Sequence, residues 1–217
     1  CYGMTETSPV STQTRKDDSL DRRTSTVGRV HPHVEVMVVD PDTDLPVPRG
    51  EPGELCTRAY SVMVGYWDEP AKTAEVLRNG WMHTGDLATM DGEGYLNIVG
   101  RIKDMVIRGG ENVYPREIEE FLYTHPDVVD AQVIGVPDEK YGEELMAWVR
   151  LREGAALDAE ALRAFCSGKL AHYKIPRYVH VVDEFPMTVT GKVRKVEMRE
   201  RAVEILGLHE AATAKHA

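Results

Sequence analysis

The sequence changes character at Gly100-Arg101, and this change limits the folds that are open to the chain. The residues before it read as short strands separated by turns rich in Pro, Gly and Asp. After it, strand and helix patterns alternate over about 110 residues, which is enough chain to bury a small independent core. We therefore expect an α+β chain in two parts: a β-rich part over residues 1–102 and a small α+β domain over residues 103–217.

The first part contains two clear strand patterns, the apolar runs VEVMVVD (residues 34–40) and GELCTRA (residues 53–59). Shorter strands are expected around residues 81–83, 87–90 and 95–99. A helix that opens at Glu69-Pro70 should end at Asn79-Gly80, because Pro favours the first turn of a helix and Gly the position after its last turn. Residues 7–26 are polar and lack apolar periodicity, which predicts a loop.

The second part opens with the run DMVIRGGENVYP, which predicts a hairpin that turns at Gly109-Gly110. A helix should start at Pro115, where Ile118, Phe121 and Leu122 form one apolar stripe.

Two further patterns place core residues in the second part. The run VVDAQVIGV alternates, which puts Val129, Ala131 and Val133 on one face of a strand. A last helix is expected to carry Met198, Ala202 and Ile205.

The composition of the chain argues against several classes of function. The 217 residues carry 26 Lys and Arg against 36 Asp and Glu, a net charge of −10, which argues against non-specific binding of nucleic acid. No apolar run approaches the about 20 residues that a membrane-spanning helix needs. Three widely spaced cysteines form neither a disulfide framework nor a zinc cluster, so a reduced, cytoplasmic setting is expected.

The first motif that could carry chemistry is Tyr2-Gly3-Met4-Thr5-Glu6. Its aromatic ring could stack on a base, its hydroxyl could reach a phosphate, and its carboxylate could hold Mg²⁺, which prefers oxygen ligands. The alternative is a polar loop without function.

The second motif is His83-Thr84-Gly85-Asp86, at the end of an expected strand. An Asp that follows a Gly is suited to accept two hydrogen bonds from a ribose diol. Thr-Gly-Asp is also ordinary turn chemistry, and taken alone the motif reads as a turn.

The third motif runs from Gly100 to Glu119 and contains the Gly-Gly hairpin. Charged residues at the junction of the two parts suit a hinge. Glycines at the tip of the hairpin allow a ligand to approach the main chain closely.

The fourth motif is Pro186-Met187-Thr188-Val189-Thr190-Gly191-Lys192. A lysine ammonium on a loop is charged at neutral pH and suits the transition state of phosphoryl or acyl-phosphate chemistry. The alternative is a surface turn with a solvated lysine.

Taken together and in this order, the four motifs resemble the adenylate-forming (AMP-binding) superfamily over nearly the whole chain. Within it the chain looks like a fatty-acid or medium-chain acyl-CoA synthetase. The resemblance implies that a carboxylic acid and ATP give an acyl-AMP and pyrophosphate, after which the acyl group passes to the thiol of coenzyme A.

The resemblance also implies roles for the nucleotide-binding residues. Tyr2 would stack on adenine, Thr5 would contact the α-phosphate, and Glu6 would bind Mg²⁺. Asp86 and Arg101 would bind the ribose hydroxyls.

Three more roles concern the second part. Lys103 would be the hinge, Gly110 would line the tunnel for the pantetheine arm of coenzyme A, and Lys192 would be the catalytic lysine of adenylation. Rotation about the hinge would present a different face of the small domain in each half-reaction, and closure would protect the acyl-AMP from water.

The family's phosphate loop does not occur in this sequence, and the chain begins with Cys1. We therefore expect a C-terminal fragment: residues 1–102 as a β-rich remnant of the large AMP-binding domain, and residues 103–217 as its C-terminal lid domain. The missing N-terminal part would be its partner, and the fragment alone is expected to be inactive.

Two other functions remain open. The chain could belong to an adenylation domain that loads an acid onto a carrier protein, or it could be a nucleotide- or coenzyme A-binding module without turnover.

Residues 161–182 hold four cations and no acid, and this stripe either meets the phosphates of coenzyme A or is a solvated face. The tryptophans, Trp67 among them, are expected to be packing residues and not ligands.

Overall fold

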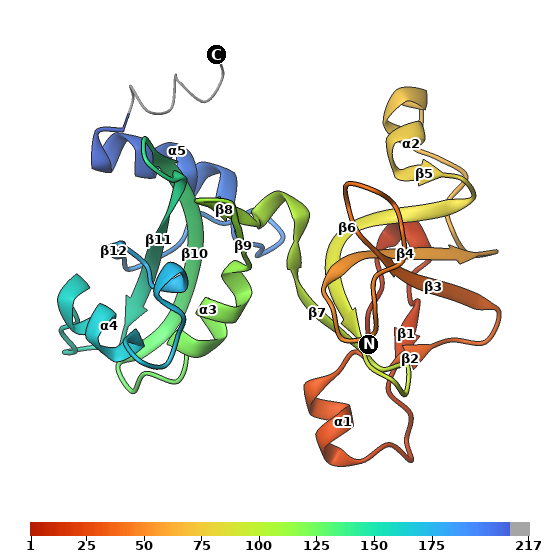
Figure 1. The fold of residues 1–217 in the computed structure, drawn as a ribbon, viewed down its shortest axis with the longest axis horizontal. Helices are drawn as coiled ribbons and strands as arrows, with labels where there is room; N and C mark the ends of the chain where they lie inside the picture. The colour runs from red at the N-terminus through yellow and green to blue at the C-terminus, as the bar shows by residue number, and fades with distance from the viewer. Residues whose placement is uncertain (209–217) are drawn as a thin grey trace. The chain divides into compact units, whose positions relative to one another are not determined.

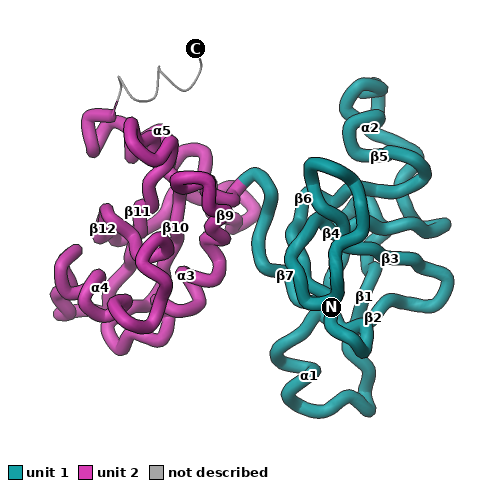
Figure 2. The backbone as a smooth tube through the Cα atoms, in the orientation of Figure 1, with its two compact units in different colours: residues 1–103 teal, residues 104–217 magenta. Residues whose placement is uncertain are grey.

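The computed structural model describes residues 1–208, which form two compact units (Figure 2). The first unit is Cys1–Lys103 and the second begins at Asp104, so the division falls directly after Lys103. Helices and strands occur in both units, and the expected α+β class is confirmed (Figure 1).

The first unit is built on a five-stranded antiparallel sheet. Its strands run in the order β3 (Val34–Val39), β4 (Gly53–Ala59) and β6 (Trp81–Met90), and both β5 (Leu77–Arg78) and β7 (Leu96–Arg101) pair with β6. A separate short pair joins β1 (Thr12–Gln13) to β2 (Arg29–Val30). The core on this sheet includes Tyr2, Leu55, Ala88 and Leu96.

Three sequence-based expectations for the first unit are wrong. Residues 7–26 are not all loop, because α1 (Leu20–Ser25) forms there, with the Ser19 hydroxyl accepting a hydrogen bond from the Arg22 N–H. Helix α2 (Pro70–Val76) ends before Asn79, since β5 begins at Leu77. Trp67 is 93% exposed and packs in no core.

The second unit contains a five-stranded sheet in the order β10 (Val128–Asp138), β11 (Gly142–Leu151), β8 (Val106–Arg108) and β9 (Glu111–Val113). Strand β12 (Tyr178–Val181) adds to β11 in parallel (Figure 1). The hairpin that turns at Gly109-Gly110 is confirmed, because Arg108 pairs with Glu111 on the two sides of the turn.

Both faces of the second sheet are covered. Successive residues of β10 and β11 point to opposite faces, as in any strand. On one face, Val133 and Val149 pack with α3 (Pro115–Leu122) and α4 (Ala159–Cys166). On the other face, Ile134 and Trp148 pack with α5 (Lys195–Leu206).

Two core assignments in the second unit are wrong. Val129 is exposed because a bulge between Val128 and Asp130 interrupts the alternation of β10. Ile205 is also exposed, while Met198 and Ala202 of the same helix are buried as expected. Among the described residues, no helix has the length and apolar character needed to cross a membrane.

Candidate functional site

Three motif residues that lie far apart in the sequence meet at one carboxylate in the first unit. The Tyr2 hydroxyl donates to Asp86 Oδ2 at 2.7 Å, and Arg101 Nε lies 2.9 Å from Asp86 Oδ1. The sheet produces this meeting, because Asp86 of β6 and Arg101 of β7 are direct cross-strand partners.

Tyr2 is part of the hydrophobic core of the first unit. It is 8% exposed and packs among apolar side chains that include Leu55 and Leu96. Burial, together with the nearby Asp86 carboxylate, raises the pKa of the Tyr2 phenol, so the hydroxyl stays protonated and donates to Asp86. Stacking of Tyr2 on adenine remains a prediction, while its contact with Asp86 is observed.

Asp86 lies in a stretch of β6 whose pairing with β4 is irregular, although its pairing with β7 is not interrupted there. Between the cross-strand pairs Glu54–Leu87 and Cys56–His83, the register shifts. The Thr84 hydroxyl donates to the Leu55 carbonyl at 2.7 Å and accepts the Asp86 N–H at 3.1 Å. Strand bulges of this kind turn a side chain to a new direction.

Thr5 and Glu6 lie on the short 3₁₀ helix η1 (Thr5–Thr7). Thr5 is exposed, and Glu6 Oε1 accepts a hydrogen bond from the Tyr66 hydroxyl at 3.1 Å. Burial and this bond raise the pKa of Tyr66. Among residues 1–208, no hydrogen bond to the second carboxylate oxygen of Glu6 is found, so the donor set fits Mg²⁺, which commonly shares one or two protein carboxylates with substrate phosphates.

Gly110 lies at the tip of the hairpin between β8 and β9. Gly109 and Gly110 have φ of +61° and +89°, as a two-residue turn between twisted strands requires. A Cβ on Gly109 would come 3.2 Å from the Tyr141 ring, whereas a Cβ on Gly110 would meet nothing within 4 Å. The main chain at Gly110 is therefore open to a ligand.

Lys192 ends a tight loop closed by Thr188. The Thr188 N–H donates to the Lys192 carbonyl at 2.7 Å, and the Thr188 hydroxyl accepts the Lys192 N–H at 3.0 Å. The Lys192 side chain is exposed and pairs with no acid of residues 1–208. Lys195 differs, because its ammonium lies 2.6 Å from Glu119.

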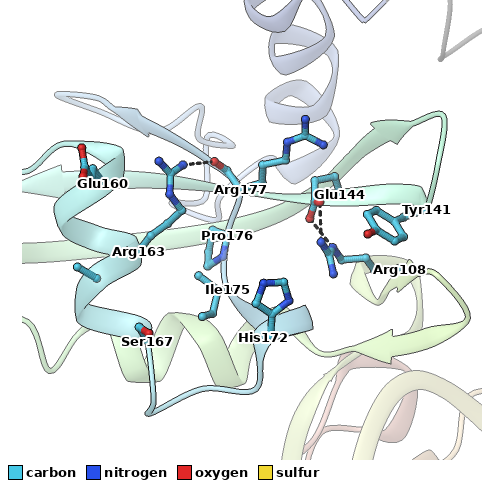
Figure 3. A pocket seen from close by; sticks show the side chains of 11 residues that line it. Arg108, Tyr141, Glu144, Glu160, Arg163, Ser167, His172, Ile175, Pro176 and Arg177 are labelled. Atoms are coloured by element: carbon cyan, nitrogen blue, oxygen red, sulfur yellow. Dashed lines mark hydrogen bonds and ion pairs between the residues drawn. The ribbon is translucent and has the colours of Figure 1, made fainter.

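An open cavity of about 620 Å³ lies in the second unit (Figure 3). Arg108 is held on one side of it by two bonds to the buried Glu144, of 2.5 and 2.8 Å, and stacks on the ring of Tyr141. The other lining residues come from α4 and from the segment that follows it: Glu160, Arg163, Ala164, Ser167, His172, Ile175, Pro176 and Arg177. Tyr141 and His172 line the cavity as well, and neither belongs to the four motifs that the sequence shows.

The basic stripe of residues 161–182 is partly neutralised by acids from elsewhere in the chain. Lys174 lies 2.7 Å from Glu117, and Arg177 lies 3.2 Å from Asp138. Arg163 donates to the Arg177 carbonyl at 2.8 Å beside the cavity (Figure 3). The stripe is therefore not a continuous row of unpaired cations.

The sequence-predicted residues divide between the units. Tyr2, Thr5, Glu6, Asp86 and Arg101 belong to the first unit, whose last residue is Lys103. Gly110 and Lys192 belong to the second unit.

Comparison with known proteins decides the family. A family model described as AMP-binding enzyme matches residues 1–67, and one described as AMP-binding enzyme C-terminal domain matches residues 117–192. The chain belongs to the AMP-binding enzymes. The resemblance drawn from the four motifs is thus confirmed.

Relatives within the AMP-binding enzymes include acyl-CoA synthetases. The putative acyl-CoA synthetase YngI of Bacillus subtilis is 55% identical over 95% of this chain and 38% of its own length. The mitochondrial medium-chain acyl-CoA ligase ACSF2 of Bos taurus is 49% identical over 95% of this chain and 34% of its own length. The chain thus spans little more than a third of either relative.

A solved structure in the family shows the same fold. ATP-bound MatB from Rhodopseudomonas palustris matches with a TM-score of 0.88 and 40% identity, over 94% of this chain and 40% of MatB.

Proposed function

We propose that the full-length protein carrying this chain activates a carboxylic acid with ATP to an acyl-AMP and then transfers the acyl group to coenzyme A. The single observation that carries the proposal is the meeting of Tyr2, Asp86 and Arg101, which gathers three nucleotide-motif residues at one carboxylate. The match to ATP-bound MatB and the names of the relatives support the same chemistry.

Residues of the first unit bind the nucleotide in this proposal. The Asp86 carboxylate accepts hydrogen bonds from the ribose hydroxyls, and the exposed Arg101 guanidinium donates beside it. The exposed Thr5 hydroxyl contacts the α-phosphate. Glu6 holds Mg²⁺, which when bound neutralises charge on the phosphates.

Residues of the second unit serve the two half-reactions. The exposed Lys192 ammonium donates to the carboxylate and the α-phosphate while negative charge passes between them. The open main chain at Gly110 gives passage to the pantetheine arm of coenzyme A. Rotation about Lys103 presents Lys192 for the first half-reaction and Gly110 for the second.

We propose a fatty acid of medium or long chain as the substrate, because ACSF2 is named a medium-chain acyl-CoA ligase. Coenzyme A is preferred over a carrier protein as the acceptor, because both relatives are named for acyl-CoA formation. A cytoplasmic location for this protein stays a prediction. One of the relatives, ACSF2, is named as a mitochondrial enzyme.

The test is fatty-acid-dependent exchange of pyrophosphate into ATP, followed by addition of coenzyme A. We expect exchange by the full-length protein, release of acyl-CoA once coenzyme A is present, and no exchange by the 217-residue chain alone. Absence of exchange in the full-length protein with every fatty acid from C6 to C18 would overturn the proposal. Exchange by the 217-residue chain would show that a phosphate loop is not needed.

A further inference from the structure

A buried glutamate contacts the nucleotide motif from the neighbouring strand. Glu54 lies on β4, and its side chain is 6% exposed. Its Oε1 accepts the Gly85 N–H at 3.0 Å, and its Oε2 lies 2.8 Å from His83 Nδ1. One carboxylate thus binds the residues on both sides of Thr84.

These contacts lie where the regular pairing of β6 with β4 is interrupted. In the pairing of β4 with β6, Glu54 lies opposite Leu87, and Cys56 lies opposite His83. The single β4 residue between them therefore faces three residues of β6, 84–86. Gly85 has a φ of +71°, which places its N–H outside the usual strand direction. The Glu54 carboxylate supplies that N–H with an acceptor and so stabilises the bulge that ends in Asp86.

The surroundings of Glu54 argue against a metal site. Ligand atoms of Glu54, Cys56 and His83 lie within 4.8 Å of one another. Arg78 already supplies a positive charge there, with Nη2 placed 2.6 Å from His83 Nδ1 and 3.6 Å from Glu54 Oε2.

The thiol in this group is buried, with Cys56 Sγ 3.4 Å from His83 Nδ1. Burial, together with the Glu54 carboxylate, raises the pKa of Cys56 to about 12. In this group Arg78 lies within ion-pair distance of two carboxylates, Glu54 and Asp44, beside the bulge.

We propose that Glu54 is a positioning residue for ribose recognition, which it serves by holding Gly85 so that the Asp86 carboxylate points at the hydroxyls. This inference rests on the proposed function, because it takes Asp86 as the ribose ligand. Glu54 itself does not touch the nucleotide.

The test measures discrimination between ATP and its 2′-deoxy and 3′-deoxy analogues in the exchange reaction of the full-length protein. We expect Glu54→Ala to lower the preference for ATP about tenfold, since a misplaced carboxylate loses hydrogen bonds to the sugar. The KM for ATP should rise more than kcat falls. Glu54→Gln should retain the preference, because its amide oxygen can still accept the Gly85 N–H.

Two reference variants separate the possible failures. Asp86→Ala measures the full loss of ribose recognition, and Glu35→Ala removes an acid that is exposed on the same sheet and pairs with Arg58. If Asp86→Ala keeps the preference for ATP, the proposed ribose site is wrong. If Asp86→Ala loses it while Glu54→Ala matches Glu35→Ala, the positioning role is wrong.

The Gln variant keeps the proposal testable if Glu54→Ala does not fold. Loss of the preference for ATP in folded Glu54→Gln would overturn the account, because the hydrogen bond to Gly85 is preserved there.

Discussion

Asp86 and Arg101 lie opposite each other on β6 and β7, with Arg101 Nε 2.9 Å from Asp86 Oδ1. The two side chains differ in exposure, since Asp86 is buried while the Arg101 side chain is 66% exposed. An ion pair with one exposed partner contributes little to stability, about 0–1 kcal/mol. The pair is therefore expected to contribute little to the stability of the fold.

Replacing Arg101 should impair nucleotide binding without unfolding the protein. We expect Arg101→Ala to raise the KM for ATP by about 10- to 100-fold, the loss of one charge-assisted hydrogen bond. The melting temperature should stay within a few degrees of the parent. Exchange kinetics and calorimetry on the same samples check both statements, and a large drop in melting temperature with unchanged KM would contradict them.

Lys192→Ala should separate the two half-reactions. We expect loss of acyl-AMP formation, because Lys192 is the proposed cation of the first step, while thioester formation from supplied acyl-AMP is largely retained. Fold stability should not change, since Lys192 is exposed and has no acidic partner in the described part of the chain. Equal loss of both half-reactions would refute the assigned role.

Lys195 provides the matched control for Lys192. Its ammonium bonds to Glu119 and to the Val133 carbonyl, so Lys195→Ala leaves a buried carboxylate with fewer partners. We expect that variant to melt at a lower temperature, and its remaining folded fraction to carry out adenylation. Urea unfolding distinguishes the two lysines directly.

Gly110→Leu should block the second half-reaction. The substitution places a side chain where the main chain is open, and we expect acyl-AMP to accumulate while acyl-CoA formation falls by at least tenfold. A leucine at positive φ also costs about 1–2 kcal/mol wherever it is placed. Acyl-CoA formation at the parental rate would exclude a pantetheine tunnel at this glycine.

Gly154→Leu controls for that backbone strain. Gly154 has a φ of +78°, is exposed, and has nothing within 4 Å of an added Cβ, as at Gly110. Its variant should lose similar stability and keep both half-reactions.

His180 should make stability depend on pH. Burial holds the pKa of His180 below its usual value of 6.5, and its ring packs edge-on against Trp148. Between that lowered pKa and 6.5 the unfolded chain binds a proton that the folded chain does not, so the free energy of unfolding falls as pH falls through this window. His180→Gln should flatten this part of the profile, which urea titrations at pH 5 to 8 would measure.

The sequence predicts those elements in which local chemistry and tertiary contacts agree. The Gly109-Gly110 turn and the start of α3 at Pro115 follow from backbone preferences alone, and both are correct. Helix α1 was missed because none of its residues is buried, which leaves no apolar stripe to detect. Val129 was misplaced because a bulge depends on the pairing of β10 with β11.

The candidate site was predictable only as a set of motifs. Tyr2, Asp86 and Arg101 could be named from short sequence patterns, yet their meeting depends on the registers of β6 and β7. Glu54 could not be connected with Gly85, because that contact appears only once β4 pairs with β6 and the bulge is in place. Its sequence signal was an acid within the otherwise strand-like run GELCTRA.

Each hydrophobic cluster found in residues 1–208 draws its side chains from a single unit. The cluster around Leu55 and Leu96 belongs to the first unit, and the clusters on the two faces of β10 and β11 belong to the second. Cooperative unfolding follows the side chains that are buried together. A core substitution such as Leu55→Ala should then lower hydrogen-exchange protection across one half of the polypeptide and leave the amides of the other half as slow to exchange as before.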